Sequence, residues 1–346
     1  MIKVSAPAKC HIIGEHAVVY GHPAIIAAVG MRIYIEAEKS GVIELKDDRW
    51  KTKRAWAVHD AYEASHKAAE MWNECMKKKD FTELLCWSKT GNSYDNYWKA
   101  MIGTVLRLAD ASSGISLHIT KCDIPTGSGL GSSSATAVAV VKAISEAYGK
   151  SLTDERINEI AYECEKLIHG TPSGGDNSAS CFGGLIWFRK VQPKNEIVSL
   201  RKEIPHKLEK FILIYSGEPK KNTGELIQMV RDIPESERNP KMQELDRMAH
   251  EMKEVLKKKN YKRMKEIINR TNEILASFGL STPETEEISR KIISLGGAAK
   301  MCGACGGGMM LAWHDKPKKI LDAMKEMGFD AYAADLAVEG VRNERV

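Results

Sequence analysis

The chain lacks an uninterrupted hydrophobic run of the length that a membrane span requires. Its most apolar stretch, residues 17–31, is broken by Gly21, His22, Pro23 and Gly30, and it falls short of the roughly 18 to 20 apolar residues that cross a bilayer. The first residues also lack the basic and then apolar layout of a secretory signal. We therefore expect a cytoplasmic protein without a membrane partner, whose eight scattered cysteines are reduced thiols.

An excess of charge of one sign is also missing. Lys and Arg number 51 against 46 Asp and Glu, a formal net charge of +5, which is far from the dense basic stripe of a nucleic-acid-binding protein. With 43% hydrophobic and 28% charged residues, the composition has no bias towards disorder or collagen-like repeats. No nucleic-acid partner is expected, and 346 residues are enough for two globular domains.

The hydrophobic pattern predicts an α+β fold in two parts, residues 1–189 and 190–346. In the first part we expect short strands at 2–4, 12–13, 24–28, 33–35, 116–119 and 185–188, and helices at 134–148 and from Thr153 to about residue 169. Residues 50–98, which hold five of the seven tryptophans, are expected to form two or three helices on a sheet, with ligand stacking by a tryptophan as the alternative. In the second part we expect strands at 211–215, 308–312 and 329–333, and helices at 222–231, 239–258, 261–278, 283–294 and 316–327.

The strongest chemical signal is a glycine-rich turn at residues 126–134. Gly127, Gly129 and Gly131 alternate with other residues, and three serines then open a predicted helix. Glycines let the backbone approach an anion closely, and a helix N-terminus attracts negative charge. The turn matches neither the Walker A nor the dinucleotide-binding pattern. It predicts phosphate binding, with a tight structural turn as the alternative.

Two carboxylates and one lysine are candidates for the chemistry. Glu165 is placed at the edge of an apolar helix stripe, where it would face a cleft, and Asp176 lies in the apparent turn 171–177. One carboxylate could hold Mg²⁺ on nucleotide phosphates while the other orients a substrate hydroxyl. Lys9, near the end of the first strand, could stabilise phosphoryl oxygens. The alternatives are solvated carboxylates and an ordinary strand-end lysine.

A Cys-x-x-Cys pair occurs in the segment 300–308, at Cys302 and Cys305. No second pair with zinc-ligand spacing lies nearby, and the glycines that follow favour close backbone approach to a ligand. We therefore interpret this segment as a loop near the phosphates, and keep a metal or redox site as the alternative.

Taken together, three segments resemble the motifs of the GHMP kinases, in order and over nearly the full length: Ala6–Gly21, Pro125–Ser134 and Lys300–Gly308. The stretch Glu165–Asn177 and, more weakly, Lys53–Trp56 and Lys221–Thr223 are most similar to the members that phosphorylate mevalonate. The resemblance implies a two-lobed fold, with a ribosomal protein S5 domain 2-like ATP-binding lobe at 1–189 and a ferredoxin-like lobe at 190–346.

The resemblance also implies an activity, which is ATP-dependent phosphorylation of the 5-hydroxyl of (R)-mevalonate in isoprenoid synthesis. Carried over by position, the ATP-binding residues are Gly127, Ser128, Gly129, Leu130, Gly131, Ser132 and Ser133. Ser133 and Glu165 match the Mg²⁺ ligands, while Asp176 and Lys9 match the catalytic residues that touch substrate. Glu15 and His16 match residues that line the substrate pocket. A homodimer is the candidate oligomer.

Four residues depart from the family pattern: Ala8, Gly175, Cys302 and Cys305. Gly175 replaces a branched aliphatic residue beside Asp176, so we expect a larger pocket and an altered choice of substrate. Alternative functions are therefore another small-molecule kinase of the family, acting on phosphomevalonate or on the 3-hydroxyl of mevalonate, or a catalytically silent nucleotide-binding regulator.

Overall fold

Two long antiparallel strands, β1 (Ile2–Ile13) and β2 (Pro23–Ser40), form the centre of the fold. The computed structural model describes residues 1–91, 94–111, 113–125, 127–193 and 195–345, so Thr126 of the glycine-rich turn lies outside the described residues. The four short strands expected in this region are all strand, but they merge into these two long strands, so only the expected breaks within each long strand are wrong. Gly30 and Met31 form a bulge where the register shifts opposite Pro7 and Ala8, and the bulge keeps the strands paired beyond the expected break.

The other strands extend this pair into one mixed sheet of twelve strands in the described part of the chain. Its main path is β4 (Thr52–Trp56), β3 (Ile43–Asp47), β5 (Gly114–Cys122), β2, β11 (Asp330–Leu336), β8 (Leu208–Tyr215), β10 (Met309–Trp313) and β9 (Ala298–Met301). Off this path, β6 (Leu185–Arg189) pairs with β2 and with β7 (Glu196–Ser199), and β12 (Arg342–Asn343) pairs with β1. The strands β8, β10 and β9 of the second half join β2 through β11, at the pair Leu336 and Val29.

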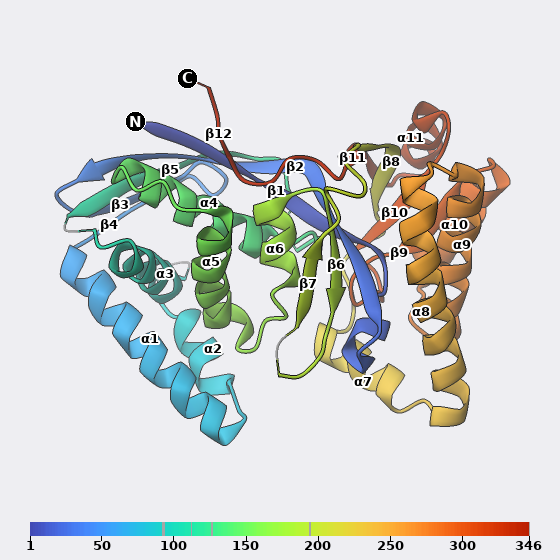
Figure 1. Cartoon of the computed structure of the whole chain (residues 1–346), viewed down its shortest axis with the longest axis horizontal. Coiled ribbons are helices and arrows are strands. Elements are labelled where there is room, and N and C mark those ends of the chain that lie inside the picture. Colours follow the sequence, from blue (N-terminus) through green and yellow to red (C-terminus); the bar gives the residue numbers. More distant parts are fainter. Residues whose placement is uncertain (92–93, 112, 126, 194, 346) are drawn as a thin grey trace.

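Helices flank the sheet in two groups, one for each half of the chain (Figure 1). The first half contributes the 3₁₀ turn η1 (Ala17–Tyr20), α1 (Val58–Lys78), α2 (Thr82–Ser88), α3 (Asp95–Leu108), α4 (Ser132–Ala147), α5 (Asp154–His169) and α6 (Gly175–Phe182). The second half contributes α7 (Thr223–Arg231), α8 (Glu235–Lys257), α9 (Tyr261–Ser277), α10 (Pro283–Ser294) and α11 (Pro317–Glu326). The helix α4 packs against both β1 and β2, and this contact places its N-terminus beside the central pair.

Most helices agree with the sequence prediction, but two segments do not. Residues 52–56 form β4 rather than the start of a helix, because they pair with β3 at the edge of the sheet. The segment 171–177 was expected to be a turn throughout, yet α6 begins at Gly175. Gly174 adopts a left-handed conformation with φ of 85°, which reverses the chain before the helix.

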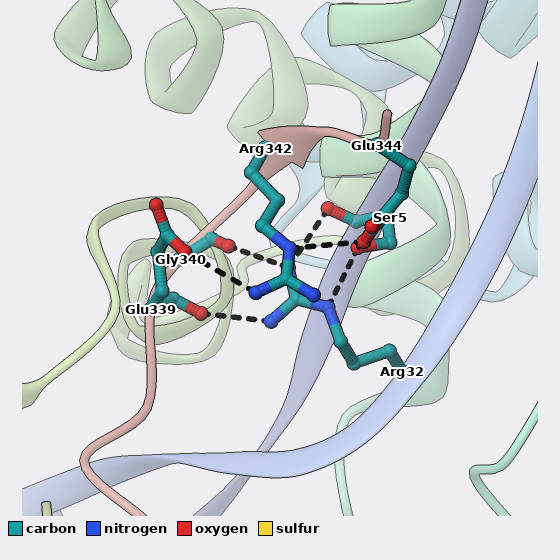
Figure 2. Close-up of polar contacts among 6 residues, drawn as sticks. All are labelled: Ser5, Arg32, Glu339, Gly340, Arg342 and Glu344. Atoms are coloured by element: carbon teal, nitrogen blue, oxygen red, sulfur yellow. Dashed lines mark hydrogen bonds and ion pairs between the residues drawn. The ribbon is translucent and has the colours of Figure 1, made fainter. Parts of the chain in front are cut away.

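The C-terminal segment returns to the first half of the chain and is fastened there by a buried arginine. Arg32, on β2, donates from Nε to Ser5 Oγ at 2.6 Å and from its Nη atoms to the carbonyls of Glu339 and Gly340 at 2.9 and 2.6 Å. Figure 2 shows the six residues of this network, Ser5, Arg32, Glu339, Gly340, Arg342 and Glu344. The network therefore ties the end of the chain to β1.

The division at 189/190 stays a prediction, and the β6–β7 hairpin crosses it. Among the described residues, no helix combines the length and the hydropathy needed to cross a membrane.

Candidate active site

Lys9 and Asp176 form an ion pair at the centre of the candidate site. Lys9 lies in the interior of β1, not near a strand end as expected, and Asp176 lies in the first turn of α6. Lys9 Nζ is 3.0 Å from Asp176 Oδ2, and the side chain of Lys9 is 7% exposed against 37% for Asp176. Burial by itself would raise the pKa of Asp176, but the Lys9 ammonium outweighs it and holds the pKa below its usual value. Asp176 is therefore an ionised carboxylate with one open side.

The glycine-rich loop is fixed to the same lysine. The Lys9 main-chain N–H donates to the Leu130 carbonyl at 2.9 Å. Gly131 has a φ of 71°, and a Cβ atom there would lie 2.8 Å from Lys9 Cγ. Glycine is thus required at 131 both for its backbone conformation and for its contact with the lysine.

The loop itself has the form of an anion cradle. Gly127 and Gly129 have φ values of 69° and 75°, and a Cβ atom on either would meet no described atom within 4 Å. The helix α4 begins directly after the loop, so its free amides and dipole favour a negative charge there. The side chains of Ser128 and Leu130 serve the loop itself, since the Ser128 hydroxyl donates to the Pro125 carbonyl at 2.7 Å and Leu130 is buried.

Glu165 lies on α5 and is almost completely buried, with 2% of its surface exposed. Its Oε2 accepts hydrogen bonds from the Ser134 hydroxyl and, at 3.4 Å, from the Ser133 hydroxyl. Burial raises the pKa of Glu165 to about 7, and the hydrogen bond from Ser134 opposes part of this rise. Glu165 therefore faces the start of α4, on the side where the glycine loop ends.

Two further side chains lie against Glu165, and for one of them, His169, the sequence predicted no role. Ser134 is buried against the carboxylate, and His169 Nε2 lies 3.6 Å from Glu165 Oε2 and 3.3 Å from Ser133 Oγ. The four-residue spacing of Glu165 and His169 on one helix places both on the same face, which is the signal that could have identified the histidine. Partial burial lowers the pKa of His169 below its ordinary value, although half of its side chain is exposed.

The residues around Glu165 fit a magnesium ion. Glu165 Oε1 is buried and has no hydrogen-bond partner among the described residues, so it is available to a cation. Mg²⁺ is commonly held by one or two carboxylates together with substrate phosphates and water. The Ser133 hydroxyl, which contacts the other carboxylate oxygen Oε2, and the start of α4, where phosphates would lie, complete such a set.

Glu15 and His16 connect the first motif to the third. Lys300, on β9, donates to Glu15 Oε1 and, at 3.2 Å, to the His11 carbonyl, and both side chains of the Lys300–Glu15 pair are fully buried. His16 Nε2 lies 3.0 Å from the Ala304 carbonyl. The two residues that were expected to line the substrate pocket thus make contacts with the second half of the chain.

The Cys-x-x-Cys segment lies in the loop between β9 and β10, beside the glycine loop. A Cβ atom on Gly308 would be 4.0 Å from the Ser128 carbonyl, which places the third motif next to the second. Cys302 and Cys305 are free thiols. Burial raises the pKa of Cys302 to about 11, so this thiol is protonated at neutral pH.

Gly175 does not enlarge the substrate pocket, and this expectation is wrong. A Cβ atom at 175 would lie 2.7 Å from Ile26 Cδ1 and 3.3 Å from Phe188 Cδ2. Both of these side chains belong to a small buried cluster under α6. Ile26 and Phe188 already fill the volume that a larger residue at 175 would occupy, so the glycine leaves no additional space.

A cavity of about 720 Å³ opens beside the first turn of α4. It is lined by Ser132, Ser133 and Thr136 of α4 and by Asp47, Arg49, Trp50, Thr52, Arg54, Lys89, Tyr94, Tyr97, Trp98, Ile124 and Ile168. Trp50 is 58% exposed and Trp98 is buried. Part of the tryptophan-rich segment therefore faces a cavity, whereas Trp72 donates from Nε1 to the Gly170 carbonyl at 2.7 Å and has a structural role.

Comparisons with known proteins identify the family of this chain. The family model for the GHMP kinases N terminal domain matches residues 96–184, and the model for GHMP kinases C terminal matches residues 252–330. The first match contains the glycine loop, Glu165 and Asp176. The second contains Lys300 and the Cys-x-x-Cys loop.

Two relatives that match over nearly their full length carry the same name. A mevalonate kinase of Thermococcus sibiricus is 31% identical over 100% of this chain and 99% of its own length. A mevalonate kinase of Pyrococcus furiosus is also 31% identical, over 99% of this chain and 98% of its own length. A crystal structure of mevalonate kinase superimposes with a TM-score of 0.81 at 24% identity, covering 98% of this chain and 100% of the other, and thereby confirms the expected fold.

Proposed function

Because the chain belongs to the GHMP kinase family, we propose that it transfers the γ-phosphoryl group of ATP to the 5-hydroxyl of (R)-mevalonate. The observation that carries the proposal is the Lys9–Asp176 pair, which is fastened through the main chain of Lys9 to the glycine loop. One lysine thus connects a carboxylate suited to a hydroxyl with a loop suited to phosphates. The names of the full-length relatives support mevalonate as the substrate.

We assign the phosphates of ATP to the loop from Gly127 to Ser133 and its nucleoside to the cavity beside α4. The cavity adjoins Ser132 and Ser133, so a nucleotide whose phosphates lie at the start of α4 can extend into it. Trp50 and Trp98 offer aromatic surface for a base, and Lys89 offers a positive charge. This assignment gives the tryptophan-rich segment a part in nucleotide binding.

Mg²⁺ is assigned to Ser133 and Glu165. When bound, it would neutralise charge on the phosphates of ATP and so make the γ-phosphorus a better target for the alcohol. Ionised Glu165 supplies the negative charge for the ion, and Ser134 orients the carboxylate through its hydrogen bond.

Asp176 and Lys9 act on the substrate hydroxyl. Phosphoryl transfer depends mainly on alignment and charge stabilisation, and the partly exposed Asp176 carboxylate can accept the hydrogen bond of the attacking hydroxyl. Asp176 then receives the proton as the hydroxyl oxygen bonds to the γ-phosphorus and the bond between that phosphorus and ADP breaks. Lys9 keeps Asp176 ionised before the reaction and places a positive charge beside the transferred group.

The proposal is tested by ADP release with mevalonate, phosphomevalonate and galactose as alternative substrates, in the presence of Mg²⁺ and ATP. We expect turnover with mevalonate alone. Turnover restricted to phosphomevalonate would assign the chain to another kinase of the family. Binding of ATP without turnover of any alcohol would identify a nucleotide-binding regulator, although the Lys9–Asp176 pair argues against that outcome.

A further inference from the structure

A second polar side chain, His11, lies on the same face of β1 as Lys9. Side chains two residues apart in a strand point to the same face, and the β1–β2 register is regular from Ala8 to His11. His11 is directly opposite Ile26 of β2. Ile26 in turn contacts the position of Gly175, the residue before Asp176. His11 therefore faces the start of α6, beside the Lys9–Asp176 pair.

The imidazole of His11 has an unsatisfied polar atom. Its Nδ1 is buried and has no hydrogen-bond partner among the described residues, whereas the residue as a whole is only partly buried. A buried polar atom without a partner is destabilising, so such an atom calls for an explanation. An isoleucine or valine would suit this position better if it served packing alone, because the cross-strand neighbour belongs to an apolar cluster.

His11 is uncharged at neutral pH. Burial and the Lys9 ammonium lower its pKa to about 3, while Asp176 opposes this shift and Lys300 adds to it. An uncharged imidazole offers one donor and one acceptor but no net charge for a carboxylate. Its best ligand is therefore a hydroxyl group, which can both donate and accept.

We propose that His11 is a substrate-binding residue: when mevalonate binds, the partly exposed imidazole turns and its Nδ1, which is buried in this structure, hydrogen-bonds the 3-hydroxyl while Asp176 and Lys9 hold the 5-hydroxyl. This assignment rests on the proposed function. The 3-hydroxyl is attached two carbons from the reacting carbon, so it lies near the reacting group, as His11 lies near Lys9 along the strand. His11 would then favour substrates that carry a second hydroxyl two carbons from the reacting carbon.

The test combines three variants with two substrates, mevalonate and its 3-deoxy analogue 5-hydroxy-3-methylpentanoate. His11→Ile removes the hydrogen bond and keeps a residue suited to a strand. His11→Asn places an amide near the position of Nδ1, and His11→Gln serves as the control that places it near Nε2. KM and kcat are measured for both alcohols, and KM is measured for ATP.

We expect His11→Ile to raise KM for mevalonate about 10- to 100-fold, the usual effect of a lost hydrogen bond to a buried group, with KM for ATP changed less than twofold. With the 3-deoxy analogue, wild type and His11→Ile should have equal KM values. The KM of His11→Asn for mevalonate should return most of the way to the wild-type value, whereas the KM of His11→Gln should stay raised.

An unchanged KM for mevalonate in His11→Ile would overturn the inference, and so would an equal rise for both alcohols, which would indicate packing alone. If His11→Ile fails to fold, the wild type decides: equal KM values for mevalonate and the 3-deoxy analogue contradict the role of His11. These outcomes leave the proposed function standing. Absence of mevalonate turnover by the folded wild type would overturn the proposed function, and the inference with it.

Discussion

At the scale of single residues, Lys9 determines the geometry of the site because it has two kinds of partner. Its ammonium pairs with Asp176, and its main-chain N–H holds the carbonyl of Leu130. Both contacts arise from one residue in the interior of a central strand, so the carboxylate and the phosphate loop are fixed relative to each other. Such alignment is the main requirement of phosphoryl transfer.

Replacement of Asp176 by Asn should abolish most of the turnover without loss of nucleotide binding. The amide cannot accept the proton of the hydroxyl, so we expect kcat to fall about 10²- to 10⁴-fold. Asp154→Asn, a change in the first turn of α5, is the matched control and should retain activity. The measurement is steady-state kinetics together with calorimetric titration of a non-hydrolysable ATP analogue. Wild-type kcat in Asp176→Asn would refute the role of this carboxylate.

The affinity for Mg²⁺ should depend on pH through Glu165. In the metal-free protein the pKa of this carboxyl is raised to about 7, so below pH 7 the group is protonated and must release its proton to bind a cation. We expect the apparent Mg²⁺ affinity, measured with the ATP analogue, to fall up to about tenfold for each pH unit below 7 and to level off above it.

The same measurement on Glu165→Gln gives the pH dependence that comes from protonation of the nucleotide alone. In this variant the apparent Mg²⁺ affinity should not show the additional fall below pH 7 that Glu165 causes. Glu163→Gln, an exposed position on the same helix, should keep the wild-type profile. A wild-type affinity that follows the Glu165→Gln profile between pH 5.5 and 7 would contradict the assignment of Glu165 to the metal.

At the scale of elements, the glycine loop and α4 act as one unit whose position depends on Gly131. Gly131→Ala and Gly149→Ala form a matched pair at the two ends of α4, with φ values of 71° and 75°. Both should lose about 1 kcal/mol of stability from the left-handed backbone. Only the methyl group at 131 meets a side chain, that of Lys9, since described atoms leave the space at 149 open.

We therefore expect Gly131→Ala to lower kcat at least tenfold and Gly149→Ala to leave it within twofold. Thermal unfolding provides the stability comparison, and steady-state kinetics provides the activity. Equal kcat values for the two variants would show that the contact between residue 131 and Lys9 has no part in catalysis.

Local sequence signals were sufficient to predict many of the helices. Thr153 caps α5 through a hydrogen bond from the Arg156 amide, and Thr282 with Pro283 begins α10, both as expected. The start of α6 was not predicted, because consecutive glycines at 174 and 175 are typical of a turn. The helix is stabilised instead by its packing on β1. Likewise, the length of β1 and β2 depends on partners that are distant in sequence.

Less of the site than of the fold could be predicted from the sequence. The glycine loop indicated phosphate binding from its residues alone, whereas the pairing of Lys9 with Asp176 joins positions 167 residues apart. That pairing was anticipated only through resemblance to a family. The resemblance gave no warning that Ile26 and Phe188 occupy the space beside Gly175.

At the scale of the whole molecule, the Glu15–Lys300 pair joins the two halves of the chain behind the active site. Both side chains are fully buried, and removal of one partner leaves an unpaired charge in the interior. We expect Lys300→Met to lower the free energy of unfolding by about 3 to 5 kcal/mol. The double variant Lys300→Met with Glu15→Gln should recover a large part of this loss, because no buried charge remains.

Urea unfolding of the two single variants and the double variant measures this coupling. Arg263→Met, which removes a half-exposed ion pair with Glu251, is the control and should change stability by about 1 kcal/mol or less. Additive losses in the double variant would show that the two charges do not stabilise each other.

The most direct test of the central claim is the position of the phosphate in the product. The folded protein, incubated with ATP, Mg²⁺ and (R)-mevalonate, should form one phosphate ester for each ADP released. ³¹P NMR with proton coupling should show a triplet, from a phosphate attached to the CH₂ of C5. A singlet from a phosphate on the 3-hydroxyl, or no ester from protein that binds ATP, would contradict the account.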